Sequence, residues 1–378
     1  MPFLPFRIGF SDRAIEDLHR RLDDARWPDV GWDTGWTTGT NDGVLRELVR
    51  YWRNNFDWRA QEAALNARAH VRGVIDGDEM HAMLMCGPGS ERRMPLLLIH
   101  GWPGSFVEFT DAGARLSSGS DDGARFDVVV PSLPGYGLSD TPRASGLHAG
   151  RIADRLHLLM RELGYERYGV QGGDWGAVIG TALARQHPEA VIGLHLNFAA
   201  GAPPPPDGVA MSDAEQAYRA FRQKFEAEES AYMRLQGTRP QTLGYALNDS
   251  PVGLLAWILE KFWAWADHGD DLWDRLDRDK VLTNVTLYWL TGHILSASRL
   301  YYEMSHTTDR VMGRVPDSVP MGYAKYPAEP WAAPREVMAR IGNLVHFAEP
   351  ERGGHFAAFE EPELFARDVA TFFGGLRS

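Results

Sequence analysis

Asp174 stands in a glycine-rich stretch, Gly172-Gly173-Asp174-Trp175-Gly176, which follows an apolar segment at 168–171 and precedes a helical pattern at 177–187. Glycines around one polar residue between a strand and a helix are typical of a sharp turn that exposes a nucleophile. The alternative is an ordinary turn in which Asp174 only caps the helix. A carboxylate that attacks an sp³ carbon forms an ester, which activated water can hydrolyse. As a nucleophile, Asp174 would therefore suit an epoxide or a carbon–halogen bond.

Two further motifs could complete such a site. His100-Gly101-Trp102-Pro103-Gly104 ends a short apolar segment, and Gly353-Gly354-His355-Phe356 follows the last predicted strand. The first turn can direct the backbone N–H of Trp102 at an oxyanion, and the N–H of Trp175 would be the second donor. His355 lies where a general base follows the nucleophile in chain order. Taken singly, these motifs also fit a glycine–proline turn and a solvated loop histidine.

The elements that must position these motifs alternate along the chain. Short apolar segments at 94–100, 126–133, 168–171 and 191–198 are expected to be strands. Helical patterns at 149–163 and 177–187 separate the later segments, which predicts a parallel sheet. From about 211 to 304 the patterns are helical, and a strand pattern returns at 343–347. With the order of the three motifs, this predicts an α/β-hydrolase fold with a mostly parallel central sheet, an inserted α-helical cap and an N-terminal meander. The expected units are an N-terminal segment at 1–69, core parts at 70–200 and 311–378, and the cap at 201–310.

Composition narrows the class of protein. The chain has 378 residues, a formal net charge of −12 and a single cysteine, Cys86. The charge argues against nucleic acid or an anionic membrane as the partner, and one cysteine excludes an intrachain disulfide and a cysteine-based zinc site. No apolar run is long enough to cross a membrane. We expect a soluble, cytosolic protein that uses no cofactor and no metal. A homodimer is compatible with this sequence.

The sequence resembles the microsomal-type epoxide hydrolases along nearly its whole length, apart from their membrane anchor. Besides the first two motifs, the matching stretches lie in the N-terminal segment, the first core part, the cap and the last loop, where the match extends the third motif. They are Arg26-Trp27-Pro28, Tyr51-Trp52-Arg53, Pro131-Ser132-Leu133-Pro134-Gly135-Tyr136-Gly137, Leu247-Asn248-Asp249-Ser250-Pro251-Val252-Gly253-Leu254, Leu282-Thr283-Asn284-Val285 and Arg352-Gly353-Gly354-His355-Phe356-Ala357-Ala358-Phe359-Glu360. Stretches of this length are far more specific than the short motifs.

The resemblance implies two cap tyrosines, Tyr232 and Tyr301, as donors to the epoxide oxygen. Two phenols opposite the carboxylate can donate hydrogen bonds as the alkoxide forms. Without the resemblance, the residues alone would not select these two among the 12 tyrosines. Tyr302 is adjacent to Tyr301 and is its nearest competitor.

The resemblance also implies an acid partner for His355. The family pattern of an acid shortly after a core strand matches Glu329, in Pro327-Ala328-Glu329, whereas Glu336 and Glu349 are competitors. Such an acid would hold the imidazole tautomer and stabilise the imidazolium.

The predicted function is an epoxide hydrolase that converts an epoxide and water to a vicinal diol through an ester on Asp174. The aromatic-rich cap indicates a small, apolar, bulky or aromatic epoxide as the substrate. One alternative is a haloalkane dehalogenase that uses the same carboxylate, with Trp175 contacting the halide. Another is an α/β-hydrolase that binds a ligand without catalysis.

Overall fold

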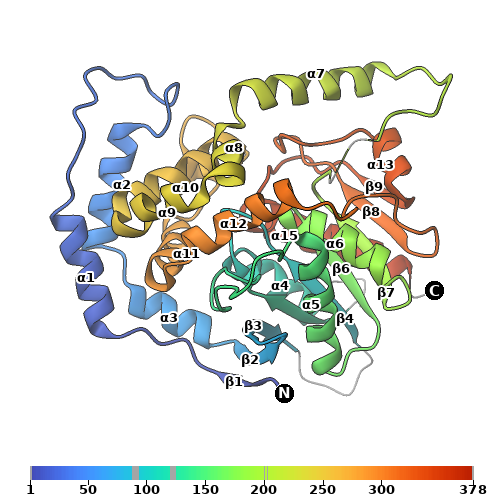
Figure 1. Cartoon of the computed structure of the whole chain (residues 1–378), viewed down its shortest axis with the longest axis horizontal. Helices are drawn as coiled ribbons and strands as arrows, with labels where there is room; N and C mark the ends of the chain where they lie inside the picture. The colour runs from blue at the N-terminus through green and yellow to red at the C-terminus, as the bar shows by residue number, and fades with distance from the viewer. Residues whose placement is uncertain (1, 87–92, 120–124, 200, 202, 377–378) are drawn as a thin grey trace.

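Nine strands form one sheet in the part of the chain that the computed structural model describes, residues 2–86, 93–119, 125–199, 201 and 203–376 (Figure 1). The strands are β1 (Leu4–Phe6), β2 (Ala69–Ile75), β3 (Asp78–Met85), β4 (Met94–Ile99), β5 (Phe126–Pro131), β6 (Tyr168–Gly172), β7 (Val191–Leu196), β8 (Pro320–Ala324) and β9 (Asn343–Ala348). They are ordered β1-β2-β3-β5-β4-β6-β7-β8-β9 across the sheet. The pairs β1–β2, β2–β3 and β3–β5 are antiparallel, and the other pairs, from β5–β4 to β8–β9, are parallel. The prediction of a mostly parallel sheet is confirmed.

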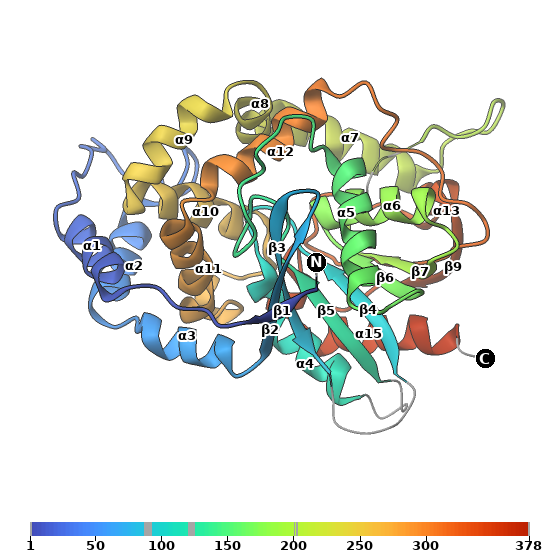
Figure 2. The same cartoon turned by 60° about the horizontal axis from the view of Figure 1, so that its bottom comes forward.

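Helices cover both faces of the parallel strands, which is why these strands are apolar throughout. Alternate residues of β6 point to opposite faces: Gly169 lies against Phe373, and Val170 lies against Gly180. One face therefore carries α15 (Pro362–Gly375), which packs with α4 (Thr110–Ser118). The other carries α6 (Trp175–Gln186), which packs with α5 (Ala149–Glu162), as Figure 2 shows.

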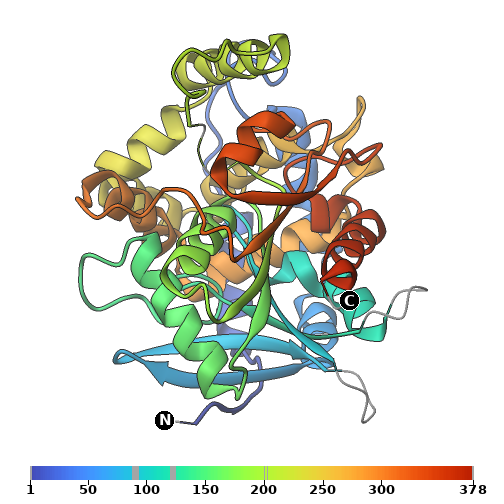
Figure 3. The same cartoon turned by 90° about the vertical axis from the view of Figure 1, so that its right-hand side faces the viewer.

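A set of helices interrupts the sheet between β7 and β8. They are α7 (Asp213–Glu228), α8 (Ala231–Thr238), α9 (Pro240–Asp249), α10 (Pro251–Trp265), the 3₁₀ turn η2 (Leu272–Asp274), α11 (Arg278–Thr291) and α12 (Ile294–His306). Figure 3 shows α7 at the end of the molecule that lies opposite the β2–β3 hairpin. These helices correspond to the predicted helical cap. The expected boundary at 200–201 includes residue 200, which lies outside the described residues.

The N-terminal segment packs against the cap helices and also adds a strand to the sheet. Its helices are α1 (Asp12–Asp23), α2 (Asp42–Asn54) and α3 (Trp58–Asn66). The Trp52 indole donates to Thr286 Oγ1 at 2.9 Å, and Trp36 stacks on Trp263 with ring centroids 4.4 Å apart. Strand β1 pairs with β2 at the sheet edge. At three residues, β1 is too short for an apolar pattern to predict it.

The remaining elements are short. They are η1 (Phe106–Phe109), α13 (Arg335–Ile341) and α14 (Ala357–Glu360). The sequence pattern does not delimit β8, because Pro320 and Gly322 within it resemble a loop. None of the helices in the described ranges combines the length and the apolar character that a membrane span needs.

Candidate active site

Asp174 occupies a strained turn between β6 and α6. Its backbone has φ 48° and ψ −126°, although positive φ is unfavourable for a residue with a side chain. The flanking glycines make the turn possible, because a Cβ on Gly172 would lie 2.2 Å from Gly176 O, and one on Gly176 would lie 1.9 Å from Ile99 O. The turn holds the carboxylate at the end of β6, where the strand gives way to the helix.

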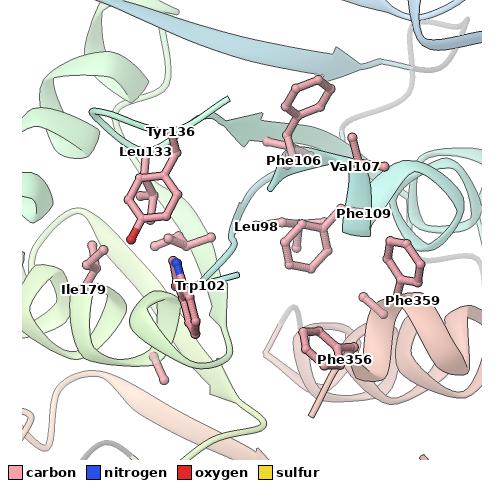
Figure 4. Packing of buried hydrophobic residues seen from close by; sticks show 14 of the residues in the cluster. Leu98, Trp102, Phe106, Val107, Phe109, Leu133, Tyr136, Ile179, Phe356 and Phe359 are labelled. Carbon is pink, nitrogen blue, oxygen red and sulfur yellow. The ribbon is translucent and has the colours of Figure 1, made fainter. Parts of the chain in front are cut away.

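The turn after β4 supplies a donor to this carboxylate. The Trp102 backbone N–H donates to Asp174 Oδ1 at 2.8 Å. Two side chains of α11 hold the turn from the cap: Asn284 Nδ2 donates to Pro103 O, and the Tyr288 hydroxyl donates to Gly104 O, both at 2.8 Å. Figure 4 shows the Trp102 side chain in the apolar cluster between this turn and α6. The first expected oxyanion donor therefore already faces the carboxylate.

Trp175, the second expected donor, is the first residue of α6. Backbone N–H groups in the first turn of a helix have no partner within the helix, so they remain available to an oxyanion. The Trp175 side chain lies edge-on to Tyr301, with ring centroids 4.8 Å apart. Trp175 also lines the same cavity as Asp174 and Tyr301.

His355 lies between two carboxylates. Its Nε2 is 3.5 Å from Asp174 Oδ2, and its Nδ1 donates to Glu329 Oε2 at 2.8 Å. Glu329 is fully buried, and its other oxygen accepts from the Trp331 N–H at 2.8 Å. The loop that carries His355 is fixed to the cap, because the His355 N–H donates to Trp265 O at 2.9 Å.

The other two candidate acids lie elsewhere on the surface. Glu336 accepts a hydrogen bond from the Ser212 hydroxyl, and Glu349 pairs with Lys325 at 3.0 Å. Among the three acids weighed from the sequence, Glu329 is the one that the structure places against His355.

The two carboxylates determine the charge of His355. Burial alone would lower the pKa of the imidazole, but the Glu329 charge and the hydrogen bond to Asp174 outweigh burial and hold the pKa well above its usual value. The two neighbouring carboxylates therefore favour the protonated imidazole. Loss of the Asp174 charge would remove part of this support and lower the pKa of His355.

Tyr232 from α8 and Tyr301 from α12 come together above the carboxylate. Their rings meet edge to face with centroids 6.0 Å apart, and both rings pack on Trp102. Burial, followed by the charge of Asp174, raises the pKa of the Tyr232 phenol well above 10, so the phenol keeps its proton. The Tyr302 side chain points away and stacks on His306, with ring centroids 4.0 Å apart.

A cavity of about 220 Å³ joins these groups. Asp174, His355, Tyr232 and Tyr301 all line it. The rest of the lining is almost entirely apolar: Trp175, Val178, Phe198, Ala199, Gly201, Phe225, Met233, Trp265, Met304, Met312, Pro330 and Trp331. A small apolar ligand in this cavity would touch the carboxylate and both phenols.

Sequence reasoning missed a second carboxyl group near the nucleophile. Glu108 lines a cavity of about 20 Å³ together with Trp102, Asp174 and His355, a volume comparable to one water molecule. Burial raises the pKa of Glu108 to about 8. No motif indicates this residue. The feature of the sequence that relates to Glu108 is Gly104. Its lack of a side chain makes room for the Glu108 carboxylate, because a Cβ at position 104 would lie 1.3 Å from Glu108 Oε1.

Within the described ranges, one cluster could offer three side-chain ligands to a metal: His195, His346 and Asp368. The Asp368 carboxylate accepts from His195 Nε2 at 2.8 Å and from His346 Nε2 at 2.7 Å. These hydrogen bonds satisfy the carboxylate and join α15 to β7 and β9. None of the three residues lines the cavity above Asp174.

Comparison with known proteins decides the family. A family model described as the epoxide hydrolase N terminus matches residues 3–109, and one described as the alpha/beta hydrolase fold matches residues 94–232. Epoxide hydrolase 1 of Oryctolagus cuniculus is 37% identical over 409 aligned residues, covering 98% of this chain and 88% of that protein. The chain belongs to the epoxide hydrolase family. The predicted class of enzyme is confirmed, and the dehalogenase and non-catalytic alternatives are not supported.

Solved structures of epoxide hydrolases have the same fold. The crystal structure of juvenile hormone epoxide hydrolase from Bombyx mori superposes with a TM-score of 0.85 at 36% identity, covering 99% of this chain and 94% of that one. The Aspergillus niger epoxide hydrolase gives a TM-score of 0.87 at 31% identity, covering 100% and 97%. The predicted α/β-hydrolase fold is therefore confirmed for this epoxide hydrolase.

Proposed function

We propose that this epoxide hydrolase forms a covalent ester on Asp174 and then hydrolyses it. The observation that carries the proposal is the meeting, in one apolar cavity, of a carboxylate, an imidazole 3.5 Å from it and two phenols. Each group has a distinct task in opening an epoxide: nucleophile, base and oxygen donors.

In the first step, a carboxylate oxygen of Asp174 bonds to a ring carbon while the carbon–oxygen bond of the epoxide breaks. Tyr232 and Tyr301 donate hydrogen bonds to the oxygen, and one of them transfers its proton to it. The product is a hydroxyalkyl ester and a phenolate. The phenols bind the negatively charged oxygen of the transition state more strongly than they bind the oxygen of the neutral epoxide. They therefore accelerate this step.

Ester formation then makes His355 a base. The ester carries no charge, so the support that Asp174 gave to the imidazolium is lost and the pKa of His355 falls. The imidazolium releases its proton, and the phenolate is reprotonated. This sequence explains how one histidine can be charged in the resting enzyme and neutral when water must be activated.

In the second step, neutral His355 takes a proton from water, whose oxygen attacks the ester carbon of Asp174. The small cavity lined by Glu108, Asp174 and His355 is suited to hold that water, because it has room for about one water molecule and shares Asp174 and His355 with the substrate cavity. The Trp102 and Trp175 N–H groups stabilise the oxyanion. When the tetrahedral intermediate collapses, the diol leaves with a proton from His355. The carboxyl group restored on Asp174 then returns a proton to His355.

The cavity favours an apolar epoxide. Phe198, Phe225 and Trp331 offer aromatic surface, and Met233 and Met304 offer flexible apolar surface that adapts to shape. We propose a bulky or aromatic epoxide small enough for about 220 Å³ as the substrate class.

Single-turnover labelling tests the proposal. Enzyme in excess over styrene oxide is mixed in ¹⁸O-water, and the diol is analysed by mass spectrometry. If Asp174 is the nucleophile, the first diol carries an unlabelled oxygen from the enzyme, and the label appears in the Asp174 carboxylate. Label in the first diol would show that water attacks the epoxide directly. Asp174→Ala should abolish diol formation, and retained turnover would also overturn the proposal.

A further inference from the structure

Lys261, on α10, is a buried lysine beside the active-site aromatic residues. It is 3% exposed, whereas the side chains of the other three lysines, Lys224, Lys280 and Lys325, are 71%, 32% and 34% exposed. Its ammonium donates to Glu260 Oε1 at 2.8 Å. A buried charge is costly unless other groups replace water, so the surroundings of this ammonium must compensate.

Aromatic rings supply that compensation. The Lys261 Nζ lies over the ring of Tyr232, 4.4 Å from its centroid, and 5.5 Å from the ring centroid of Trp265. The Tyr232 ring also stacks on Trp102, with centroids 5.3 Å apart and planes at 10°. The cation therefore contacts the ring of a phenol that lines the same cavity as Asp174.

We propose that Lys261 is a positioning residue for epoxide opening, whose ammonium stabilises the Tyr232 ring as the phenol donates to the opening oxygen. The proposal rests on the proposed function of Tyr232. When the phenol proton moves to the alkoxide, negative charge spreads into the ring, and attraction to the cation becomes stronger than in the resting enzyme. Because the gain arises in the transition state, Lys261 should raise the rate of ester formation rather than substrate affinity.

The negative charges around Tyr232 oppose the release of its proton. Besides burial, the carboxylates of Asp174, Glu329 and Glu260 raise the pKa of the phenol. Tyr301 on α12 is the neighbouring phenol, and His355, whose ring is 4.9 Å from that of Trp265, carries the other positive charge. During ester formation the negative charge of Asp174 disappears. The positive charges of Lys261 and His355 then stabilise negative charge on the Tyr232 phenol against fewer opposing carboxylates.

The test measures the pre-steady-state rate of ester formation with styrene oxide as the substrate. Tryptophan fluorescence monitors the reaction. Lys261→Met removes the charge at similar volume, Lys261→Arg retains it, and Lys280→Met is the matched control. We expect Lys261→Met to slow ester formation at least about tenfold, Lys261→Arg to restore most of the rate, and Lys280→Met to have no effect. The basic limb of the pH profile should move to higher pH in Lys261→Met, because the phenol loses a neighbouring cation.

A double-mutant comparison separates this role from a structural one. In a Tyr232→Phe background, Lys261→Met should change ester formation less than about threefold, because no phenol remains to be stabilised. Equal losses in both backgrounds, or an unmoved pH limb, would overturn the proposal. If thermal unfolding shows that Lys261→Met is not folded, Lys261→Gln takes its place in the same comparison. Failure of the proposed function would instead appear as unchanged ester formation in Tyr232→Phe itself.

Discussion

Replacing Glu329 by Gln should impair ester hydrolysis far more than ester formation. The substitution keeps the size of the side chain and its acceptor for the Trp331 N–H, which is bonded to Glu329 Oε1. The amide nitrogen then faces His355 Nδ1 in place of Oε2. Because that nitrogen is a donor, His355 must carry its proton on Nε2, the atom that has to accept a proton from water.

The magnitude follows from the lost charge. Two unit charges about 4 Å apart attract by about 4 kcal/mol at an effective dielectric constant of about 20. Each 1.36 kcal/mol corresponds to about a factor of ten in rate, so removing the charge that stabilises the imidazolium should slow hydrolysis by about 100- to 1,000-fold. Ester formation should change by less than about tenfold, because Glu329 contacts neither the epoxide nor Asp174.

Stopped-flow tryptophan fluorescence resolves the two steps, since Trp175 adjoins the esterified residue. The Glu329→Gln enzyme should show rapid ester formation followed by slow decay, with kcat equal to the decay rate. Glu336→Gln and Glu349→Gln serve as controls, and both should behave as the unaltered enzyme. Hydrolysis at the unaltered rate in Glu329→Gln would refute the reasoning that Glu329 orients and charges His355.

Other consequences concern the phenols and the last helix. Tyr232→Phe and Tyr301→Phe should each slow ester formation by about 10- to 100-fold, since a hydrogen bond to a charged group contributes about 1.5–3 kcal/mol; a double variant with unchanged single-turnover rate would exclude them as donors. Burial would raise the pKa of Asp368, but hydrogen bonds from His195 and His346 outweigh it and lower the pKa. Its contribution to stability is therefore complete above the unfolded pKa of about 3.9 and is lost as the pH falls further. Urea unfolding should show Asp368→Asn about 2 kcal/mol less stable at pH 5, with a smaller difference at pH 3; a difference that grows on acidification would contradict this sign.

The sequence predicts the elements that depend on local chemistry. The glycines around Asp174 predict the turn. Two backbone segments approach each other so closely there that a side chain at Gly172 or Gly176 would not fit. The apolar runs at 94–100 and 126–133 predict strands, and the structure has strands β4 (Met94–Ile99) and β5 (Phe126–Pro131) there, with helices on both faces of the sheet. The local sequence pattern does not predict short or interrupted strands such as β1 and β8, because residues far away in the sequence determine their pairing.

The parts of the site that come from the cap are harder to predict. Tyr232 and Tyr301 have no distinguishing local pattern, and their selection depended on the family resemblance. Tyr302 differs from Tyr301 by one position on a helix, and the direction in which α12 faces the core separates the two. Lys261 and Glu108 carry no motif at all. Their neighbours come from segments far away in sequence, so only the folded chain brings them beside the nucleophile.

The central claim is a covalent ester on Asp174 that His355 hydrolyses. The most direct measurement is the intact mass of the His355→Gln enzyme after mixing with styrene oxide, with Asp174→Ala/His355→Gln as the control. The account predicts a stable gain equal to the full mass of the epoxide, because ring opening expels no leaving group, and no gain in the control. An unchanged mass with continued diol release, or the same adduct in the control, would contradict it.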